Sequence, residues 1–337
     1  MSEEMLAGRR AFLARGAVAG AAVGASLLAG GGAEAGTSGR PGRRDIAILK
    51  FLAAAELVEA DLWLQYEELA RSNREFRAAL VDIDDGLADY AIDTQEDEES
   101  HATFINAYLV SIGEQPLNLD PFRTIMPPAV NGLRRVGRLT NLTALTVDTS
   151  YYTRYRSVEN PDFGATFPQI ATIRRKPAVP TSNGLNARQL SAVVQTAAFH
   201  FASIEQGGSS LYDQFTPIVS HPDVRRIVSS IYATEAIHFA VFRQALEGIT
   251  GFRSGDGRLV IPNLTNGRRE ARRVMPRPCH FLRRDLPRCS VIRPSLTANA
   301  GAVAAATGLV ASGLFAGQPP AFFNAVVALA KAADGVA

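Results

Sequence analysis

The pattern Glu-x-x-His occurs twice in the chain, at Glu98 to His101 and at Glu235 to His238. Residues three apart on a helix face nearly the same direction, so each pair can present a carboxylate oxygen and an imidazole nitrogen to one metal ion. One such pair is weak evidence, because histidines are often simply hydrogen-bonded in a core. Two pairs constrain the fold much more strongly, since both helices must then face one shared interior.

Apolar residues recur at helical spacing in four long stretches, at about 45–71, 84–111, 187–215 and 222–248. The last follows Ser220-His221-Pro222-Asp223, where an early proline and an acid favour a helix start. The two stretches without a Glu-x-x-His pair each carry a glutamate within an apolar face, Glu56 and Glu205. One Glu, one Glu-x-x-His, one Glu and one Glu-x-x-His is the order found in four-helix bundles with a di-iron or di-manganese centre.

The spacing of these residues agrees with two helical hairpins. Glu205 and Glu235 each lie about 15 residues from the turn at 220–221, and Glu56 and Glu98 are equidistant from Arg77. Both pairs would therefore stand level across their hairpins. The predicted metal ligands are Glu56, Glu98, His101, Glu205, Glu235 and His238.

Four carboxylates inside a bundle would repel one another and lose hydration. Two divalent cations would cancel their charge, and two imidazoles would complete a set of ligands suited to iron or manganese. We therefore expect two divalent metal ions, Fe or Mn. The alternative is that Glu56 and Glu205 are partly exposed surface residues and that both histidines are ordinary core residues.

Residues next to the ligands are expected to orient them, because a ligating imidazole usually donates its other N–H to a carboxylate or carbonyl. Asp97 is placed to reach His238, and Thr234 occupies the equivalent place toward His101.

Two further residues, Glu59 and Tyr212, complete the predicted surroundings of the site. Glu59, one turn after Glu56, is the replacement ligand if the helix register is shifted. Tyr212 shares a face with Glu205 and can either stand near the metals or pack in the core. His200 and His221 match neither motif and are predicted to be structural.

Residues 113–186 form a long crossover between the second and third helices, far longer than a turn requires. Periodicity does not decide whether Tyr151 to Tyr155 is helix or strand, and we expect its aromatic side chains to pack onto the bundle. The crossover is rich in proline, at Pro116, Pro121, Pro127, Pro128, Pro161, Pro168, Pro177 and Pro180.

The N-terminal 35 residues are typical of a twin-arginine export signal. Arg9-Arg10 precedes a weakly apolar run, and Ala33-Glu34-Ala35 supplies a cleavage site. A linker follows at 36–44. We expect a periplasmic or extracellular protein, with an uncleaved N-terminal anchor as the alternative.

Residues 251–337 form a C-terminal extension. Outside the cytoplasm Cys279 and Cys289 are expected to form a disulfide, the alternative being a metal site that includes His280. The apolar stretch 294–330 is divided by Gln318-Pro319-Pro320 into two predicted helices. The first carries a stripe of small residues that permits close helix packing onto the bundle or a second subunit: Gly301, Ala305, Gly308 and Ser312.

The net charge of +2 and the scattered basic residues argue against a nucleic-acid partner. With 47% hydrophobic residues the chain can bury a large core. The C-terminal apolar segments are short and diluted by polar residues, so no stable membrane span is expected in the mature chain.

The chain resembles the ferritin-like domain family that includes plant and bacterial desiccation-related proteins. The resemblance implies an all-α fold: a four-helix bundle at 45–250, with a long crossover and a helical C-terminal extension. It implies a metal centre but no substrate. The segments that carry the resemblance are 51–63, Asp84-Asp85-Gly86, 97–101, 160–164, 203–208 and 234–238.

Two functions are compatible with this resemblance. A redox protein would use the metal pair on O₂ or peroxide, as a ferroxidase, peroxidase or catalase-like enzyme that protects the cell envelope. A non-catalytic stress protein would use the metals only to stabilise its fold. A homo-oligomer is compatible with either, whereas an iron-storage cage fits poorly with the crossover and the C-terminal extension.

Overall fold

The computed structural model describes residues 39–265, 275–291 and 301–336. The predicted export signal at 1–35 and the first residues of the predicted linker lie outside these ranges. The described residues from Pro41 onward form one compact unit. No helix among the described residues is both long enough and apolar enough to cross a membrane.

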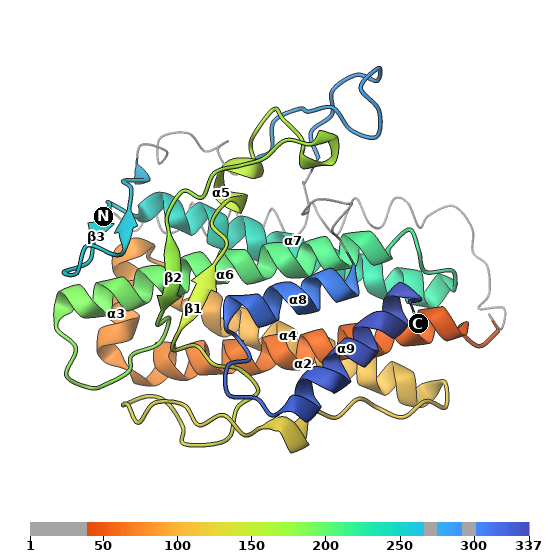
Figure 1. Cartoon of the computed structure of the whole chain (residues 1–337), viewed down its shortest axis with the longest axis horizontal. Coiled ribbons are helices and arrows are strands. Elements are labelled where there is room, and N and C mark those ends of the chain that lie inside the picture. The colour runs from red at the N-terminus through yellow and green to blue at the C-terminus, as the bar shows by residue number, and fades with distance from the viewer. Residues whose placement is uncertain (1–38, 266–274, 292–300, 337) are drawn as a thin grey trace. The chain divides into compact units, whose positions relative to one another are not determined.

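Four long helices form the bundle: α2 (Arg43–Ser72), α4 (Leu87–Ser111), α6 (Ala187–Phe215) and α7 (Pro222–Ala245). They lie side by side in Figure 1, where α2 pairs with α4 and α6 pairs with α7. The predicted four-helix bundle is therefore confirmed, together with its crossover and C-terminal helices.

Local capping explains where the second pair of helices begins. The side chain of Asn186 accepts a hydrogen bond from the backbone N–H of Gln189, and the Gln189 side chain accepts one from Asn186 N–H. This capping box starts α6. His221 caps α7 by accepting from Asp223 N–H, which gives this histidine the structural role predicted for it.

The segment between α2 and α4 forms a short helix rather than a plain connecting loop. Asn73 ends α2 and caps α3 (Arg74–Ile83) by accepting a hydrogen bond from Phe76 N–H. Phe76 and Leu80 are fully buried. Burial of this apolar face stabilises a helix that is too short to persist alone.

The crossover contains little regular structure, and the chain is mostly helical rather than purely α. Strands β1 (Leu145–Val147) and β2 (Ile173–Lys176) pair antiparallel, and the short helices are η1 (Asp120–Phe122), α5 (Tyr151–Arg154) and η2 (Pro161–Phe163). Tyr151, for which periodicity did not decide between helix and strand, lies in helix α5. Its OH donates to Phe199 O at 2.9 Å and its ring meets Phe239 edge-on, so it packs onto the bundle as expected.

A buried acid on α2 fastens the crossover to the bundle. The carboxylate of Asp61 accepts hydrogen bonds from the backbone N–H groups of Leu139 and Thr140, each at 3.0 Å, and from the Thr140 hydroxyl at 2.7 Å. Arg123 pairs with the same carboxylate at 2.6 Å. This network holds the long connection against one helix of the bundle.

After α7 the chain continues through η3 (Leu246–Gly248) and a second antiparallel pair, β3 (Phe252–Arg253) and β4 (Val260–Ile261). Two helices complete the fold, α8 (Ala302–Ser312) and α9 (Pro320–Asp334), separated at the predicted Gln318-Pro319-Pro320 break. Helix α9 packs on α2 and α8. The carboxylate of Asp334 accepts hydrogen bonds from Ala302 N–H at 2.8 Å and Val303 N–H at 2.9 Å.

The predicted disulfide between Cys279 and Cys289, both of which the structure describes, is not formed. The two residues exchange backbone hydrogen bonds across an antiparallel bridge, at 3.0 and 2.9 Å. Their sulfurs contact different groups, the side-chain amide of Asn160 at 3.7 Å and the carbonyl of Ser290 at 3.8 Å. The backbones are thus adjacent while the side chains are engaged elsewhere.

Candidate metal centre

All six predicted ligands meet in the interior of the bundle. Helix α2 supplies Glu56, α4 supplies Glu98 and His101, and α6 supplies Glu205, while α7 completes the set with Glu235 and His238. The four carboxyl side chains are at most 1% exposed. Glu56 and Glu205 are therefore not surface residues, and the alternative explanation of the motif is wrong.

The six residues form two overlapping groups. The first comprises Glu56, Glu98, His101 and Glu235, and the second comprises Glu98, Glu205, Glu235 and His238. Within each group the possible ligand atoms lie within 4.8 Å of one another. Each group has one glutamate and one histidine of its own, and the two groups share Glu98 and Glu235. This arrangement fits two ions bridged by two carboxylates.

Both imidazoles present the same nitrogen to the carboxylates. Nδ1 of His101 lies 3.3 Å from Glu98 Oε2 and 3.4 Å from Glu56 Oε2. Nδ1 of His238 lies 3.2 Å from Glu98 Oε1 and 3.1 Å from Glu205 Oε2. Because Nδ1 of each ring faces the centre, Nε2 is left for an orienting partner.

That partner is present for one histidine, as the sequence predicted. Nε2 of His238 lies 2.9 Å from Asp97 Oδ2. No hydrogen bond joins Thr234 to His101 among the described residues, so the equivalent role of Thr234 stays a prediction. The two halves of the centre therefore differ in how firmly their imidazoles are held.

Tyr212 combines the two roles that the sequence left open. It is almost fully buried, and its hydroxyl donates a hydrogen bond to Glu56 Oε1. This contact leaves Glu56 Oε2 without a hydrogen-bond partner in the described part of the chain. Tyr212 thus orients one carboxylate of the centre.

Glu59 belongs to neither group, so the helix register is the one that places Glu56 at the centre. It nevertheless lies next to the site. A Cβ atom placed on Gly208 would meet Glu235 Oε2 at 2.2 Å and Glu59 Oε1 at 3.5 Å. Glu59 is thus a fifth carboxyl group beside the four of the predicted ligand set. Gly208, which has no side chain, leaves room for Glu59 and Glu235.

The close approach over Gly208 was missed at the level of sequence. Its signal is the pair Gly207-Gly208 inside α6, where helix propensity disfavours glycine. A glycine in mid-helix indicates that something approaches the backbone closely.

The electrostatics of the site show how strongly it requires cations. Burial, reinforced by the charge of Glu98, raises the pKa of Glu56 to about 8. Burial likewise raises the pKa of Glu205 to about 7 and that of Glu235 well above its ordinary value. Burial opposes ionisation of Glu98 too, but hydrogen bonds from His101 and His238 hold its pKa at about 2.

The histidines titrate in the opposite sense. Burial lowers the pKa of His101, but contacts with Glu56 and Glu98 outweigh it and raise the pKa to about 10. For His238 the effect of burial is outweighed by the charge of Glu205 and by the hydrogen bond that the ring donates to Asp97, and the pKa lies well above its usual value. By contrast His200 is neutral, because burial lowers its pKa to about 3, and its Nδ1 meets Tyr66 OH at 2.8 Å.

The donor set fits metal ions. Buried oxygens of Glu56, Glu205 and Glu235 have no hydrogen-bond partner within the described residues, and such groups are costly to bury unsatisfied. Carboxylate oxygens with two imidazole nitrogens form the combination expected for iron or manganese. Two divalent ions would satisfy these oxygens and cancel four negative charges.

Fold and site together define a four-helix bundle built around paired carboxylate and histidine clusters. A family model described as the ferritin-like domain matches residues 44–248, more than half of the chain. The chain therefore belongs to the ferritin-like domain family. No curated protein and no solved structure matches it.

Proposed function

We propose that this ferritin-like protein binds two iron or manganese ions through its six clustered residues and uses them to consume O₂ or peroxide, protecting its compartment from oxidative damage. The observation that carries the proposal is the sharing of Glu98 and Glu235 between two ligand groups, which fits a bridged metal pair. Such a pair, when bound, would give two electrons to the oxidant and regain them from a second molecule of peroxide or from an external reductant.

The surrounding residues support a reactive centre. Six protein residues cannot saturate two ions of higher coordination number, so positions remain for a small molecule. Asp97 and Tyr212 hold the ligands His238 and Glu56 in place. Trp63, fully buried and stacked on Phe242 with ring centroids 5.0 Å apart, lies beside Glu205.

A second function, stabilisation of the fold by metal, is favoured because several glutamates are buried close together. Glu56, Glu59, Glu205 and Glu235 all have raised pKa values because they are buried near one another. Metal binding would relieve this repulsion and stabilise the fold without any reaction. The two functions differ in whether loaded protein turns over an oxidant.

The deciding experiment loads the reduced protein with Fe(II) or Mn(II) and measures the consumption of peroxide and O₂. Multiple turnovers are expected with peroxide, and with O₂ when ascorbate is added as the reductant, and Glu205→Ala should remove both while circular dichroism stays helical. Glu99→Ala is the matched control, because Glu99 follows the ligand Glu98 but is exposed. Loaded wild-type protein that is inert to both oxidants, but melts far lower after metal removal, would decide for the stabilising role.

We also propose that the protein acts outside the cytoplasm, after export by the twin-arginine route, and that it is of the desiccation-related type. The support is the Arg9-Arg10 motif with its Ala33-Glu34-Ala35 site, together with segments such as 203–208. N-terminal sequencing of protein from the periplasmic fraction tests export. An intact Met1 in cytosolic material would reject it.

A further inference from the structure

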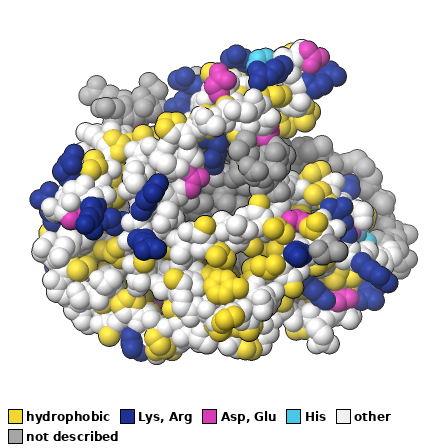
Figure 2. Space-filling view, viewed as in Figure 1, with side chains coloured by type: hydrophobic (Ala, Val, Ile, Leu, Met, Phe, Trp, Pro, Cys, Tyr) yellow, Lys and Arg dark blue, Asp and Glu magenta, His cyan; other side chains and the backbone are white. Residues whose placement is uncertain are grey.

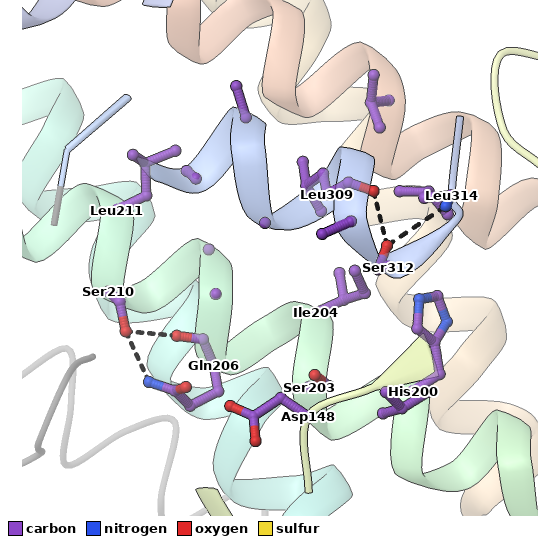
Figure 3. A pocket seen from close by; sticks show the side chains of 18 of the residues that line it. Asp148, His200, Ser203, Ile204, Gln206, Ser210, Leu211, Leu309, Ser312 and Leu314 are labelled. Carbon is purple, nitrogen blue, oxygen red and sulfur yellow. Dashed lines mark hydrogen bonds between the residues drawn. The ribbon is translucent and has the colours of Figure 1, made fainter. Parts of the chain in front are cut away.

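A pocket of about 570 Å³ lies between α2, α6, the β1–β2 pair and α8. Figure 3 shows Ile204 and Leu211 on α6 and Leu309 on α8, the two helices that form opposite walls. Hydrophobic side chains also gather on the outer surface over α8 and α9 (Figure 2). The volume is in the range that holds small organic ligands.

Small residues keep this pocket open. A Cβ atom on Gly207 of α6 or on Gly308 of α8 would meet no atom within 4 Å. The stripe formed by Gly301, Ala305, Gly308 and Ser312, which had suggested close helix packing, lines the pocket instead. The two helices are thus held apart by a space rather than packed backbone to backbone.

The polar side chains along the pocket are largely occupied within the protein. Gln206 donates to Ser210 Oγ at 2.6 Å, and Ser312 donates to Leu309 O at 2.7 Å (Figure 3). Asp148 accepts from Ser150 N–H at 2.9 Å and from the Gln169 side chain at 2.7 Å. Gln206, Ser210 and Ser312 are thus paired within the protein, and most of the remaining lining residues are apolar, so the body of the pocket is suited to an apolar molecule.

One polar atom is the exception. Among the described residues that line the pocket, Glu59 Oε2 is the single buried side-chain oxygen or nitrogen without a hydrogen-bond partner. Glu59 and Gly208 both line the pocket and both adjoin Glu235 of the metal centre. The unsatisfied acceptor therefore stands where the pocket approaches the metal centre.

We propose that this pocket binds a neutral, hydrophobic organic molecule with one hydrogen-bond-donating group, such as a hydroxyl, which contacts Glu59 beside the metal centre. The apolar walls favour the body of the ligand, and the single unsatisfied carboxyl oxygen favours one donor at its inner end. The ligand site does not depend on the proposed oxidation, because the residues that line the pocket include none of the six clustered acids and histidines.

Titration of the metal-loaded full chain with 1-naphthol tests the site, with naphthalene as the probe that lacks the hydroxyl. We expect saturable one-to-one binding of 1-naphthol, about tenfold tighter than that of naphthalene. In Glu59→Ala the two probes should bind alike, with metal content measured in parallel. A preference for the hydroxyl that persists in Glu59→Ala would overturn the role of Glu59.

The walls are tested with Gly308→Leu, which fills the pocket from a helix that carries none of the six clustered residues. It should weaken 1-naphthol binding roughly tenfold. Thr307→Leu is the matched control, since Thr307 is the exposed neighbour outside the pocket lining, and it should bind normally. Ala305→Leu is a second filling variant, and circular dichroism checks that each variant folds.

If wild-type protein shows no saturable binding of 1-naphthol, or if both filling variants bind it as wild-type does, the proposal that this pocket binds the ligand is rejected. Peroxide consumption measured on the same wild-type sample keeps the two proposals separate. Probe binding without turnover rejects only the redox function. Turnover without probe binding rejects only the ligand site.

Discussion

Nε2 of His238 lies 2.9 Å from Oδ2 of Asp97, while Nδ1 of the same ring faces Glu98 and Glu205. The acid therefore fixes which nitrogen the imidazole presents to the centre. Asp97 is half exposed, so its contribution comes from orientation more than from burial.

We predict that Asp97→Ala lowers metal affinity by about 10- to 100-fold, the usual effect of removing a hydrogen bond to a ligating histidine. Thr234→Ala, at the equivalent place on the other side, should change affinity little, because Thr234 makes no hydrogen bond to His101. Competition with a chelator measures both. Equal losses in the two variants would contradict the asymmetry of the centre.

Two adjacent glycines offer a second test. A methyl group on Gly208 would lie 2.2 Å from Glu235 Oε2, so Gly208→Ala must displace this shared carboxylate and should weaken metal binding by roughly tenfold. In Gly207→Ala the added methyl group has no atom within 4 Å. Because alanine favours a helix over glycine, this variant should raise the free energy of unfolding by about 0.5 to 1 kcal/mol. Metal analysis with denaturant unfolding of both variants decides. Normal loading of Gly208→Ala would show that Glu235 does not occupy the shared position.

The third prediction concerns the stability of metal-free protein. The pKa of Glu205 is raised to about 7 and that of Glu56 to about 8, from 4.5. Between pH 4.5 and 8 the native state thus holds protons that the unfolded chain has released, and raising the pH destabilises it, on the order of a few kcal/mol. His101, with a pKa near 10, extends the loss above pH 8.

Denaturant midpoints at pH 5 and pH 8 measure this effect. The metal-loaded protein is the control, because divalent ions displace the protons and affinity for them rises with pH. Release of protons on loading at pH 6 is the complementary observation. A metal-free protein that is more stable at pH 8 than at pH 5 would show that these carboxyls are not protonated in the native state.

Trp63 provides an optical test of occupancy. It is the single tryptophan of the chain, it is fully buried, and its indole N–H lowers the pKa of Glu205 against the larger effect of burial. Paramagnetic Fe(II) or Mn(II) bound beside Glu205 should quench its fluorescence in proportion to loading. Zn(II), which has a closed shell, should bind with little quenching. If Mn(II) does not quench the fluorescence of Trp63 while metal analysis finds two bound ions, the ions are bound away from Glu205.

The bundle and the clustering of the six acids and histidines were predictable because both follow short-range spacing. The period of α6 and α7 and the Glu-x-x-His interval depend only on helix geometry, and the level pairing of Glu205 with Glu235 depends only on a short turn. Asp97 followed from the same register. These features need no knowledge of the rest of the chain.

Features that depend on long-range packing were not predictable. Helix α3 is stabilised by burial of Phe76 and Leu80 rather than by a strong sequence signal. The stripe that includes Gly308 is compatible with a packed helix or with a cavity, and only the position of α8 decides between them. The spacing of Cys279 and Cys289 brings their backbones together but does not set the direction of their side chains.

The hydrogen bonds from Ala302 and Val303 to Asp334 make α8 depend on α9. An 11-residue helix is marginal on its own, so α8 and α9 should exchange their amide hydrogens as one cooperative unit. Asp334→Ala should speed amide exchange in α8 and leave exchange in α4 and α7 unchanged. Equal acceleration in α8, α9, α4 and α7 would contradict the independence of the α8–α9 unit from the bundle. Because α8 supplies none of the clustered acids or histidines, its local unfolding would open one wall of the pocket while the six clustered residues stay in the folded bundle.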